Sequence, residues 1–182
     1  MTRACAGDPN LRRPTTHGRL RAVSHPSLGL PPPSRTAGFA QDAQRIVATR
    51  DRLAARAFEA AVAADPTIRD RHDEAAQQRL VRDTRTVLDV LARAVASNDP
   101  REMAHWAEQV VPPYRRLGVP MDDLVTIANA VRAVVDSATT PEAFAAAGAA
   151  LDAAIAVFRW HRRIAGDARR RNRLLSFIYK GA

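Results

Sequence analysis

Residues 73–96 read DEAAQQRLVRDTRTVLDVLARAVA, and this stretch decides the class of the fold. Its large apolar residues recur at three, four and seven positions, which is the spacing along one face of an α-helix. A helix with this pattern buries its apolar stripe against other elements and exposes its charged face to water. The stretch therefore predicts a long amphipathic helix whose stripe consists of Leu80, Val81, Val87, Leu88, Leu91 and Val95.

The chain from Phe39 onward carries the same kind of signal. Ala-rich segments with few glycines follow one another, and no segment is rich in alternating Val, Ile and Thr as a half-buried strand would be. We therefore predict an all-α bundle of about six to seven helices. The helices expected before residue 100 are residues 40–63, a short turn at 66–71, and the long helix from His72 or Asp73 to about Ala96.

Two breaks divide the second half of the chain. Ser97-Asn98-Asp99-Pro100 ends the long helix and starts the next, with Asp99 as N-cap and Pro100 at the first helical position. We expect this helix to end near Val111, because Pro112-Pro113 follows. In Leu117-Gly118-Val119-Pro120, Gly118 suits the position after a helix C-terminus. Further helices are expected from Met121 to about Val135 and from Thr140-Pro141-Glu142 onward.

Length and composition limit the class of protein. A chain of 182 residues with 46% hydrophobic residues is long enough for one domain with tails and for a substantial core. Cys5 is the only cysteine, which excludes a disulfide scaffold and gives no reason to expect an oxidising compartment. No uninterrupted apolar run approaches the roughly 18–20 residues of a membrane span. We expect a cytoplasmic protein.

The net charge of +9 lies entirely in the two ends of the chain. Residues 1–38 contain six arginines and one acidic residue, and residues 159–182 contain eight basic residues and one acidic residue. The body, residues 39–158, contains 14 arginines and 17 acidic residues. The first segment is also rich in proline and has no helical or strand period. We therefore divide the chain into a disordered Pro/Arg-rich leader at 1–38, a helical domain at 39–164, and a basic and apolar C-terminal helix or tail at 165–182.

Enzymatic chemistry finds no support in the motifs. The five histidines are scattered without the i, i+4 spacing of a helical metal site, and there is no cysteine cluster. No Gly-rich phosphate loop is present, and no pair of carboxylates stands out as an acid and base. We predict a protein that is not an enzyme.

The C-terminal segment supports one alternative function. Arginines recur from Arg159 to Arg173, and the apolar run Leu174-Leu175-Ser176-Phe177-Ile178-Tyr179 follows. Such a segment could bind phosphates of a nucleic acid or of an anionic membrane. The other interpretation is a solvated helix end whose apolar tip contacts the body or a second subunit.

The order of these helices resembles that of bacterial globins. The segment from Leu53 to Arg69 is similar to their second helix and the turn after it. The helix from Gln77 and the segment from Tyr114 to Val119 resemble the distal helix and the proximal helix with its corner. The last helix, beginning at Pro141, resembles their final helix. The resemblance covers roughly residues 40–160 and implies a globin-like fold.

The globin resemblance assigns expected roles to individual residues. In a haem globin an imidazole of the proximal helix coordinates the iron, and the matching position here holds Tyr114. Phe58 stands where bacterial globins often carry a distal tyrosine, and Gln77 could serve as a distal hydrogen-bond donor. His72 stands where an aromatic residue normally packs against the haem. A haem-binding protein would therefore need Tyr114 as its iron ligand.

Haem-free branches of the globin-like fold resemble the middle of the chain more closely. Leu80-Val81-Arg82-Asp83, Asn98-Asp99-Pro100 and Tyr114 to Pro120 are similar in order to phycobiliprotein subunits such as allophycocyanin. There an attachment cysteine precedes a leucine-arginine-aspartate run whose aspartate contacts the bilin nitrogens. Leu80 takes the cysteine position here, while Arg82 and Asp83 remain, which implies that any bilin is held without a covalent bond. Haem-free sensor domains of the stressosome type share the same order of helices, separated by breaks at Asp-Pro and Gly-Val.

Together these observations predict a non-enzymatic globin-like module that acts as a sensor or an assembly subunit. It is expected to be free of haem or to bind a tetrapyrrole only non-covalently, and no cofactor at all is the favoured expectation. A homo-oligomer or a helical protein partner is expected. A ligand pocket is predicted between the 73–96 helix and residues 101–135, with the candidate lining residues Phe58, Gln77, Leu80, Arg82, Asp83, Tyr114 and Leu124.

Overall fold

A computed structural model describes residues 37–165 of the chain, with side chains through Arg163. Within this range the protein forms seven α-helices and one 3₁₀ turn, and it contains no strand, so the predicted all-α fold is confirmed. Nearly all of the predicted leader, and the tail from residue 166, lie outside the described residues. The elements are α1 (Ala40–Ala48), α2 (Arg50–Ala64), α3 (Thr67–Arg71), α4 (Glu74–Ser97), α5 (Arg101–Arg116), α6 (Met121–Val135), η2 (Asp136–Ala138) and α7 (Pro141–Ala165).

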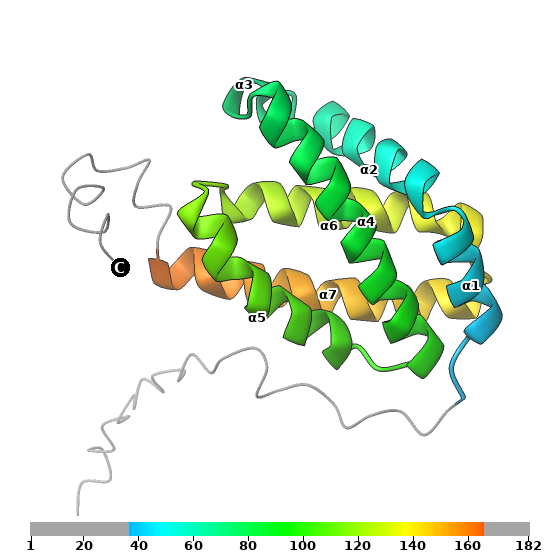
Figure 1. The fold of residues 1–182 in the computed structure, drawn as a ribbon. Coiled ribbons are helices and arrows are strands. Elements are labelled where there is room, and N and C mark those ends of the chain that lie inside the picture. The colour runs from blue at the N-terminus through cyan, green and yellow to red at the C-terminus, as the bar shows by residue number, and fades with distance from the viewer. Residues whose placement is uncertain (1–36, 166–182) are drawn as a thin grey trace, which may run out of the picture.

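The helices enclose a single core around α4 (Figure 1). In the view of Figure 1, α4 crosses in front of the paired helices α6 and α7. α5 lies along α7, and α2 packs against both α4 and α6. α1 covers the C-terminal half of α4. α4 thus contacts α1, α2, α5, α6 and α7, more partners than any other helix has.

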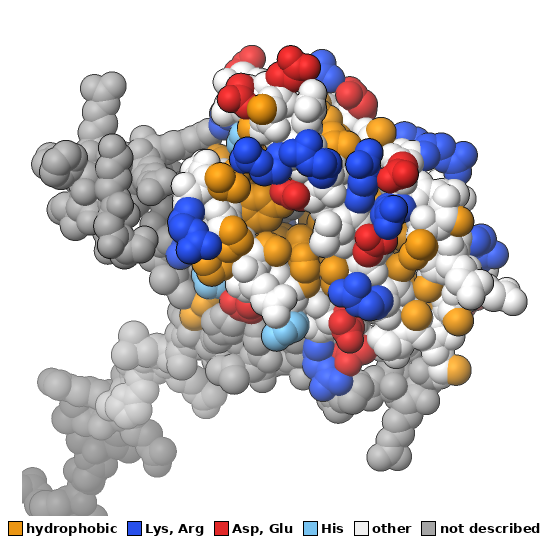
Figure 2. Space-filling view, viewed as in Figure 1, with side chains coloured by type: hydrophobic (Ala, Val, Ile, Leu, Met, Phe, Trp, Pro, Cys, Tyr) orange, Lys and Arg blue, Asp and Glu red, His pale blue; other side chains and the backbone are white. Residues whose placement is uncertain are grey.

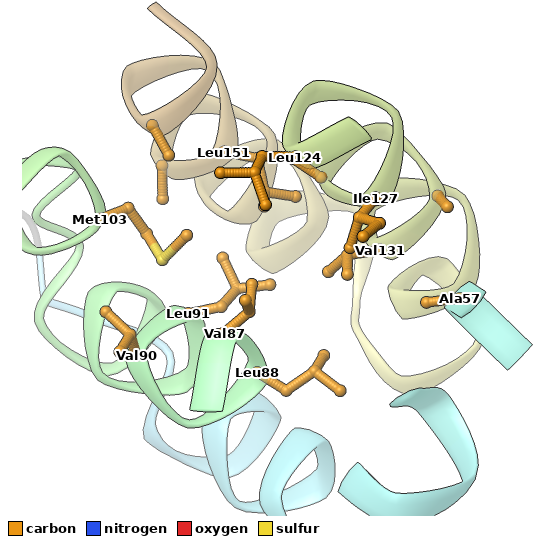
Figure 3. Packing of buried hydrophobic residues seen from close by; sticks show 14 of the residues in the cluster. Ala57, Val87, Leu88, Val90, Leu91, Met103, Leu124, Ile127, Val131 and Leu151 are labelled. Carbon is orange, nitrogen blue, oxygen red and sulfur yellow. The ribbon is translucent and has the colours of Figure 1, made fainter. Parts of the chain in front are cut away.

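The apolar stripe predicted on α4 is buried. Leu88, Leu91 and Val95 are fully inaccessible to solvent, and Leu80 and Val87 are nearly so. The remaining member of the stripe, Val81, is partly buried against the same core. Figure 3 shows Leu91 of α4, Met103 of α5 and Leu151 of α7 pointing toward the same space. The stripe therefore brings α5, α6 and α7 together on one side of α4, with the large buried residues Met103, Val131 and Leu151.

Short polar residues set the ends of the central helices. The Asp73 carboxylate accepts a hydrogen bond from the Ala76 amide at 2.8 Å, which caps α4. At its other end Asn98 adopts a left-handed conformation with φ of 50°, and the Asp99 carboxylate accepts from the Arg101 amide at 3.0 Å. The predicted break is confirmed, although the helix proper begins one residue after Pro100. Gly118, with φ of 73°, ends α5 as expected.

The expected single helix over 40–63 is in fact two helices. Thr49, with φ of −109° and ψ of 8°, leaves the helical conformation and separates α1 from α2. Its hydroxyl donates to the Arg45 carbonyl at 2.8 Å, which gives that carbonyl a side-chain partner at the helix end. The break is required by packing, because α1 lies mainly on α4 while α2 crosses α4 to reach α6.

The prediction that Pro112-Pro113 ends a helix is wrong. α5 continues through both prolines to Arg116. A proline inside a helix removes a backbone hydrogen bond and costs about 3 kcal/mol. Burial of Val111 and Tyr114, on either side of the two exposed prolines, offsets this cost. Tertiary packing therefore overrides the local preference of the two prolines.

The sequence was expected to contain no segment as long and apolar as a membrane span, but α7 contains one. Residues Pro141–Arg163 are long and apolar enough to cross a membrane, by length and composition alone. Half of the apolar stretch is buried inside the bundle, where α7 packs against α5 and α6. The many alanines of α7 let these neighbours approach closely. Its apolar character thus matches that of a helix in the core of a bundle.

The central position of α4 leads to a test. Leu91→Ala removes a side chain with no solvent exposure and leaves a cavity between α4, α5 and α7, so we expect the free energy of unfolding to fall by about 2–5 kcal/mol. Val47→Ala is the control, because Val47 is 47% exposed and its truncation is expected to cost less than about 0.5 kcal/mol. Urea denaturation followed by circular dichroism measures both. Equal losses would contradict a core centred on α4.

Candidate functional site

A partly enclosed hollow lies between α4, α5, α6 and α7. Figure 2 shows apolar side chains surrounding a recess on this face of the molecule. The walls are mainly apolar, and α4 and α5 contribute the few polar groups at the rim. The lining includes Leu80, Asp83, Trp106, Tyr114, Leu124 and Phe158.

A hydrogen bond between α4 and α5 crosses the rim of the hollow. The Tyr114 hydroxyl donates to the Asp83 Oδ2 atom at 2.8 Å. Burial raises the pKa of Tyr114 far above its usual value, and the charge of Asp83 raises it further. The nearby Arg79 only partly opposes this rise in the Tyr114 pKa. Tyr114 is therefore a neutral phenol that serves as the partner of a carboxylate.

Four of the predicted pocket residues meet at this hollow. Leu80 and Asp83 of α4, Tyr114 of α5 and Leu124 of α6 all line it. Arg82, although adjacent to Asp83, is exposed on the outer face of α4. The predicted Arg82/Asp83 pair is therefore not directed at one common ligand. The helical period separates the two side chains by about 100° around the axis, which places them on different faces.

The other two predicted residues lie elsewhere. Phe58 of α2 is buried and lines a separate, shallow groove between α2 and α4. The Gln77 amide donates to the backbone carbonyls of His72 and Arg69, at 2.8 and 3.4 Å. Gln77 thus holds the end of α3 against the start of α4, where it supports the backbone and lies outside the hollow.

The residues at the hollow do not fit a tetrapyrrole. The enclosed volume is about 20 Å³, which is room for about one water molecule. Ligand pockets of proteins typically enclose about 300–1,000 Å³. Leu80 offers no thiol for a bilin, and the Tyr114 hydroxyl is engaged by Asp83. The chain's own side chains therefore fill the space in which the globin resemblance would place a cofactor.

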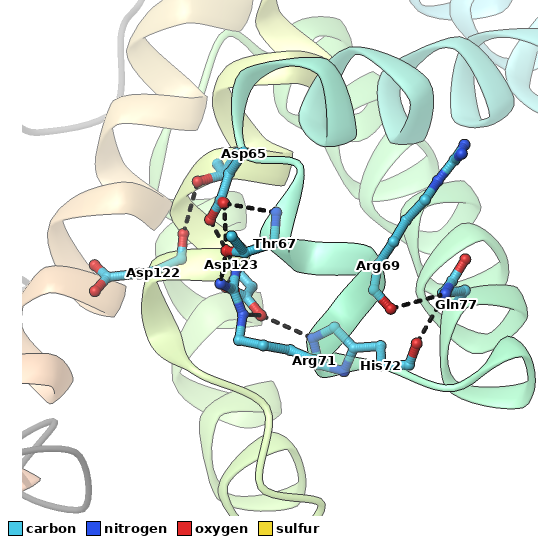
Figure 4. A network of polar contacts seen from close by, with 9 residues as sticks. Asp65, Thr67, Arg69, Arg71, His72, Gln77, Asp122 and Asp123 are labelled. Atoms are coloured by element: carbon cyan, nitrogen blue, oxygen red, sulfur yellow. Dashed lines mark hydrogen bonds and ion pairs between the residues drawn. The ribbon is translucent and has the colours of Figure 1, made fainter.

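A second polar cluster ties α3 to the start of α6 (Figure 4). Asp123, only 1% exposed, accepts from Arg71 Nη2 at 2.6 Å and lies 2.7 Å from His72 Nε2. Arg71 also donates to Asp65 Oδ2 at 2.7 Å. Hydrogen bonds from Thr67 and Arg71 hold the pKa of Asp65 below its usual value. The cluster therefore joins the turn after α2 to the N-terminus of α6.

No motif or spacing in the sequence indicates this cluster. Asp123 is separated from His72 by 51 positions in the chain, so no local spacing announces the contact. The available signal was the pair Asp122-Asp123 in the first turn of a helix, where carboxylates are favoured by the helix dipole. Such a signal predicts two capping carboxylates and says nothing about which one is buried.

Neither cluster has the composition of a metal centre, and the comparisons do not identify a family. Among the described residues, no three His, Cys, Asp or Glu side chains gather in an arrangement that could hold a metal ion. Comparison of the chain with protein-family models, with curated proteins and with solved structures finds no match.

The state of Tyr114 can be tested by titration. In a Tyr179→Phe variant Tyr114 is the only tyrosine, and we expect its absorbance at 295 nm to stay that of a neutral phenol past pH ~10 while the protein is folded. In guanidinium the same variant is expected to ionise near pH ~10. Since only the unfolded state then releases this proton, stability falls as the pH rises past about 10. Ionisation of the folded protein near pH ~10 would contradict the buried Tyr114–Asp83 pair.

The buried carboxylate of the second cluster gives another test. Asp123→Ala leaves Arg71 without one of its two carboxylate partners and is expected to lower the free energy of unfolding by about 3–5 kcal/mol. Asp122→Ala is the matched control, because Asp122 is partly exposed and pairs with Arg162 at 2.9 Å. That pair is worth at most about 1 kcal/mol. Chemical denaturation measures both variants, and equal losses would contradict a structural role specific to Asp123.

Proposed function

We propose that the protein is a non-enzymatic, haem-free module with a globin-like arrangement of helices, which acts as a sensor or assembly subunit. The proposal includes a cytoplasmic location, for which Cys5 as the only cysteine is the sequence argument. The observation that carries it is the Tyr114–Asp83 hydrogen bond across a hollow of about 20 Å³. A bundle whose interior is filled in this way has no cavity for a substrate at the hollow, and its outer surface remains available to other proteins.

The order and packing of the helices support the globin-like part of the proposal. α2 packs across both α4 and α6, α6 runs beside α7, and α5 lies on α7. The breaks at Asp99-Pro100 and at Gly118-Val119 separate α4, α5 and α6, as in the rhythm shared with haem-free sensor globins and phycobiliproteins. The hollow lies between α4 and α5, which correspond by this resemblance to the distal and proximal helices.

The polar groups at the hollow support a non-enzymatic role. Asp83 accepts a hydrogen bond from the Tyr114 hydroxyl, and the raised pKa of Tyr114 disfavours the phenolate form that a nucleophile or an iron ligand requires. Thr84, also at the hollow, donates its hydroxyl to the Leu80 carbonyl of its own helix at 2.7 Å. The Tyr114–Asp83 bond joins α4 to α5, and the Thr84 bond satisfies a buried hydroxyl within α4.

The alternative function at the basic C-terminal segment draws no support from the described part of α7. Arg162 pairs with Asp122 of α6 at 2.9 Å, and Arg163 lies over the Trp160 ring with 5.7 Å to its centroid. These two arginines are engaged by the protein itself. The arginines from 169 to 173 lie outside the described residues.

Two measurements on the purified full chain test the proposal. After expression with added haem precursor or biliverdin, we expect no Soret band and no bilin absorbance, because the hollow has no room for a tetrapyrrole. Light scattering at high micromolar concentration is expected to give the mass of a dimer or larger particle. A stoichiometric Soret band would reject the haem-free assignment, and a strictly monomeric mass would reject self-assembly.

A further inference from the structure

We propose that the shallow groove between α2 and α4 binds an amphipathic, acidic helix of a partner protein. The groove is distinct from the hollow, since Ala55, Phe58 and Ala60 of α2 line it together with Val81 of α4 and Val134 of α6. Its floor is apolar, and Arg56 lies at its edge. The proposal extends the assembly role above by naming the chemistry of one partner.

Exposed arginines on α2 and α4, the two helices that border the groove, have no acidic partner within the described part of the protein. Arg52 and Arg56 of α2 and Arg82 of α4 are all exposed, and none forms an ion pair there. Figure 2 shows basic side chains gathered in a band that crosses the N-terminal half of α4 toward α2. An anion that binds here would therefore meet guanidinium groups that are not already neutralised.

The acidic residues nearby are already engaged by other groups. Asp51 pairs with Arg85 at 3.0 Å, and Asp89 accepts two hydrogen bonds from Arg50 at 3.0 Å. Glu59, the acidic residue that lines the groove, pairs with Arg69 at 2.9 Å. These pairs leave Arg52, Arg56 and Arg82 as a local positive excess on a domain, residues 39–164, that contains equal numbers of arginines and acidic residues.

The shape of the groove favours a helix as the bound element. α2, α4 and α6 all contribute apolar side chains to its floor, and an apolar surface between packed helices can bind the apolar face of an amphipathic helix. Apolar residues spaced at i, i+3 and i+4 would contact Phe58 and Val81, while flanking carboxylates would reach Arg56 and Arg82. A nucleic acid would use only the arginines and leave the apolar floor without a partner.

A selection experiment tests this proposal with the full-length protein. A display library of 16-residue helical peptides with randomised surface positions is panned against the wild-type chain. We expect the selected peptides to be enriched in Asp and Glu beside an apolar i, i+3, i+4, i+7 pattern. The double variant Arg56→Glu/Arg82→Glu is expected to weaken binding of a selected peptide at least tenfold, as measured by fluorescence polarisation, because two attractive charges become repulsive.

A matched double variant separates a groove effect from a change in net charge. Arg93→Glu/Arg116→Glu makes the same change in net charge at two exposed arginines near the C-terminal ends of α4 and α5, and it is expected to keep wild-type affinity for the peptide. Arg93 follows Arg82 by eleven residues, about 16 Å along α4. Selected peptides without acidic enrichment, or equal losses in the two double variants, would overturn the proposal.

Two further outcomes distinguish this proposal from others. A 20-base-pair DNA that competes with the peptide at equal affinity would overturn the helix proposal in favour of a general polyanion surface. A chain that forms dimers but selects no acidic peptide would reject the groove proposal and leave the assembly role standing. A monomeric chain that binds the selected peptide through Arg56 and Arg82 would support the groove proposal and reject self-assembly.

Discussion

Burial of one face of α4 is the interaction on which the rest of the structure depends. Leu88, Leu91 and Val95 lose all contact with water, and the helices that cover them come from both halves of the chain. At about 1.5–3 kcal/mol for each buried aliphatic side chain, this stripe is a large part of the driving force for folding. The positions of the hollow and of the α2–α4 groove follow from it, because both are bounded by α4.

The space between α4 and α5 is occupied by a polar pair, Tyr114 and Asp83. Tyr114 and Asp83 satisfy each other, so their burial leaves no unpaired hydroxyl at the rim of the hollow. The same pair fixes the separation of the two helices. We regard this as the physical basis of the proposed haem-free role: the polar contact spans the space between the helices, and what remains for binding is the outer surface of the bundle.

Periodicity and capping residues predicted the helices well, whereas contacts between distant residues could not be predicted. Asp73 and Asp99 act as caps because their carboxylates reach amides two or three positions away, a local property. The split at Thr49 and the passage of α5 through Pro112-Pro113 depend on what each helix packs against. Leu80, Asp83, Tyr114 and Leu124 line one hollow, whereas Gln77, Phe58 and Arg82 lie outside it, because the sequence does not specify the rotation of each helix about its axis.

The two prolines within α5 have a consequence for how the bundle can deform. Neither Pro112 nor Pro113 has an amide hydrogen, so the turn that precedes Tyr114 lacks two of the backbone hydrogen bonds of an ordinary helix. The wall of the hollow that carries Tyr114 is consequently held more by side-chain burial than by its own backbone. Widening of the space between α4 and α5 would begin at this turn, where bending breaks the fewest hydrogen bonds. In α5, two consecutive prolines thus lie directly before the tyrosine whose hydroxyl joins this helix to α4.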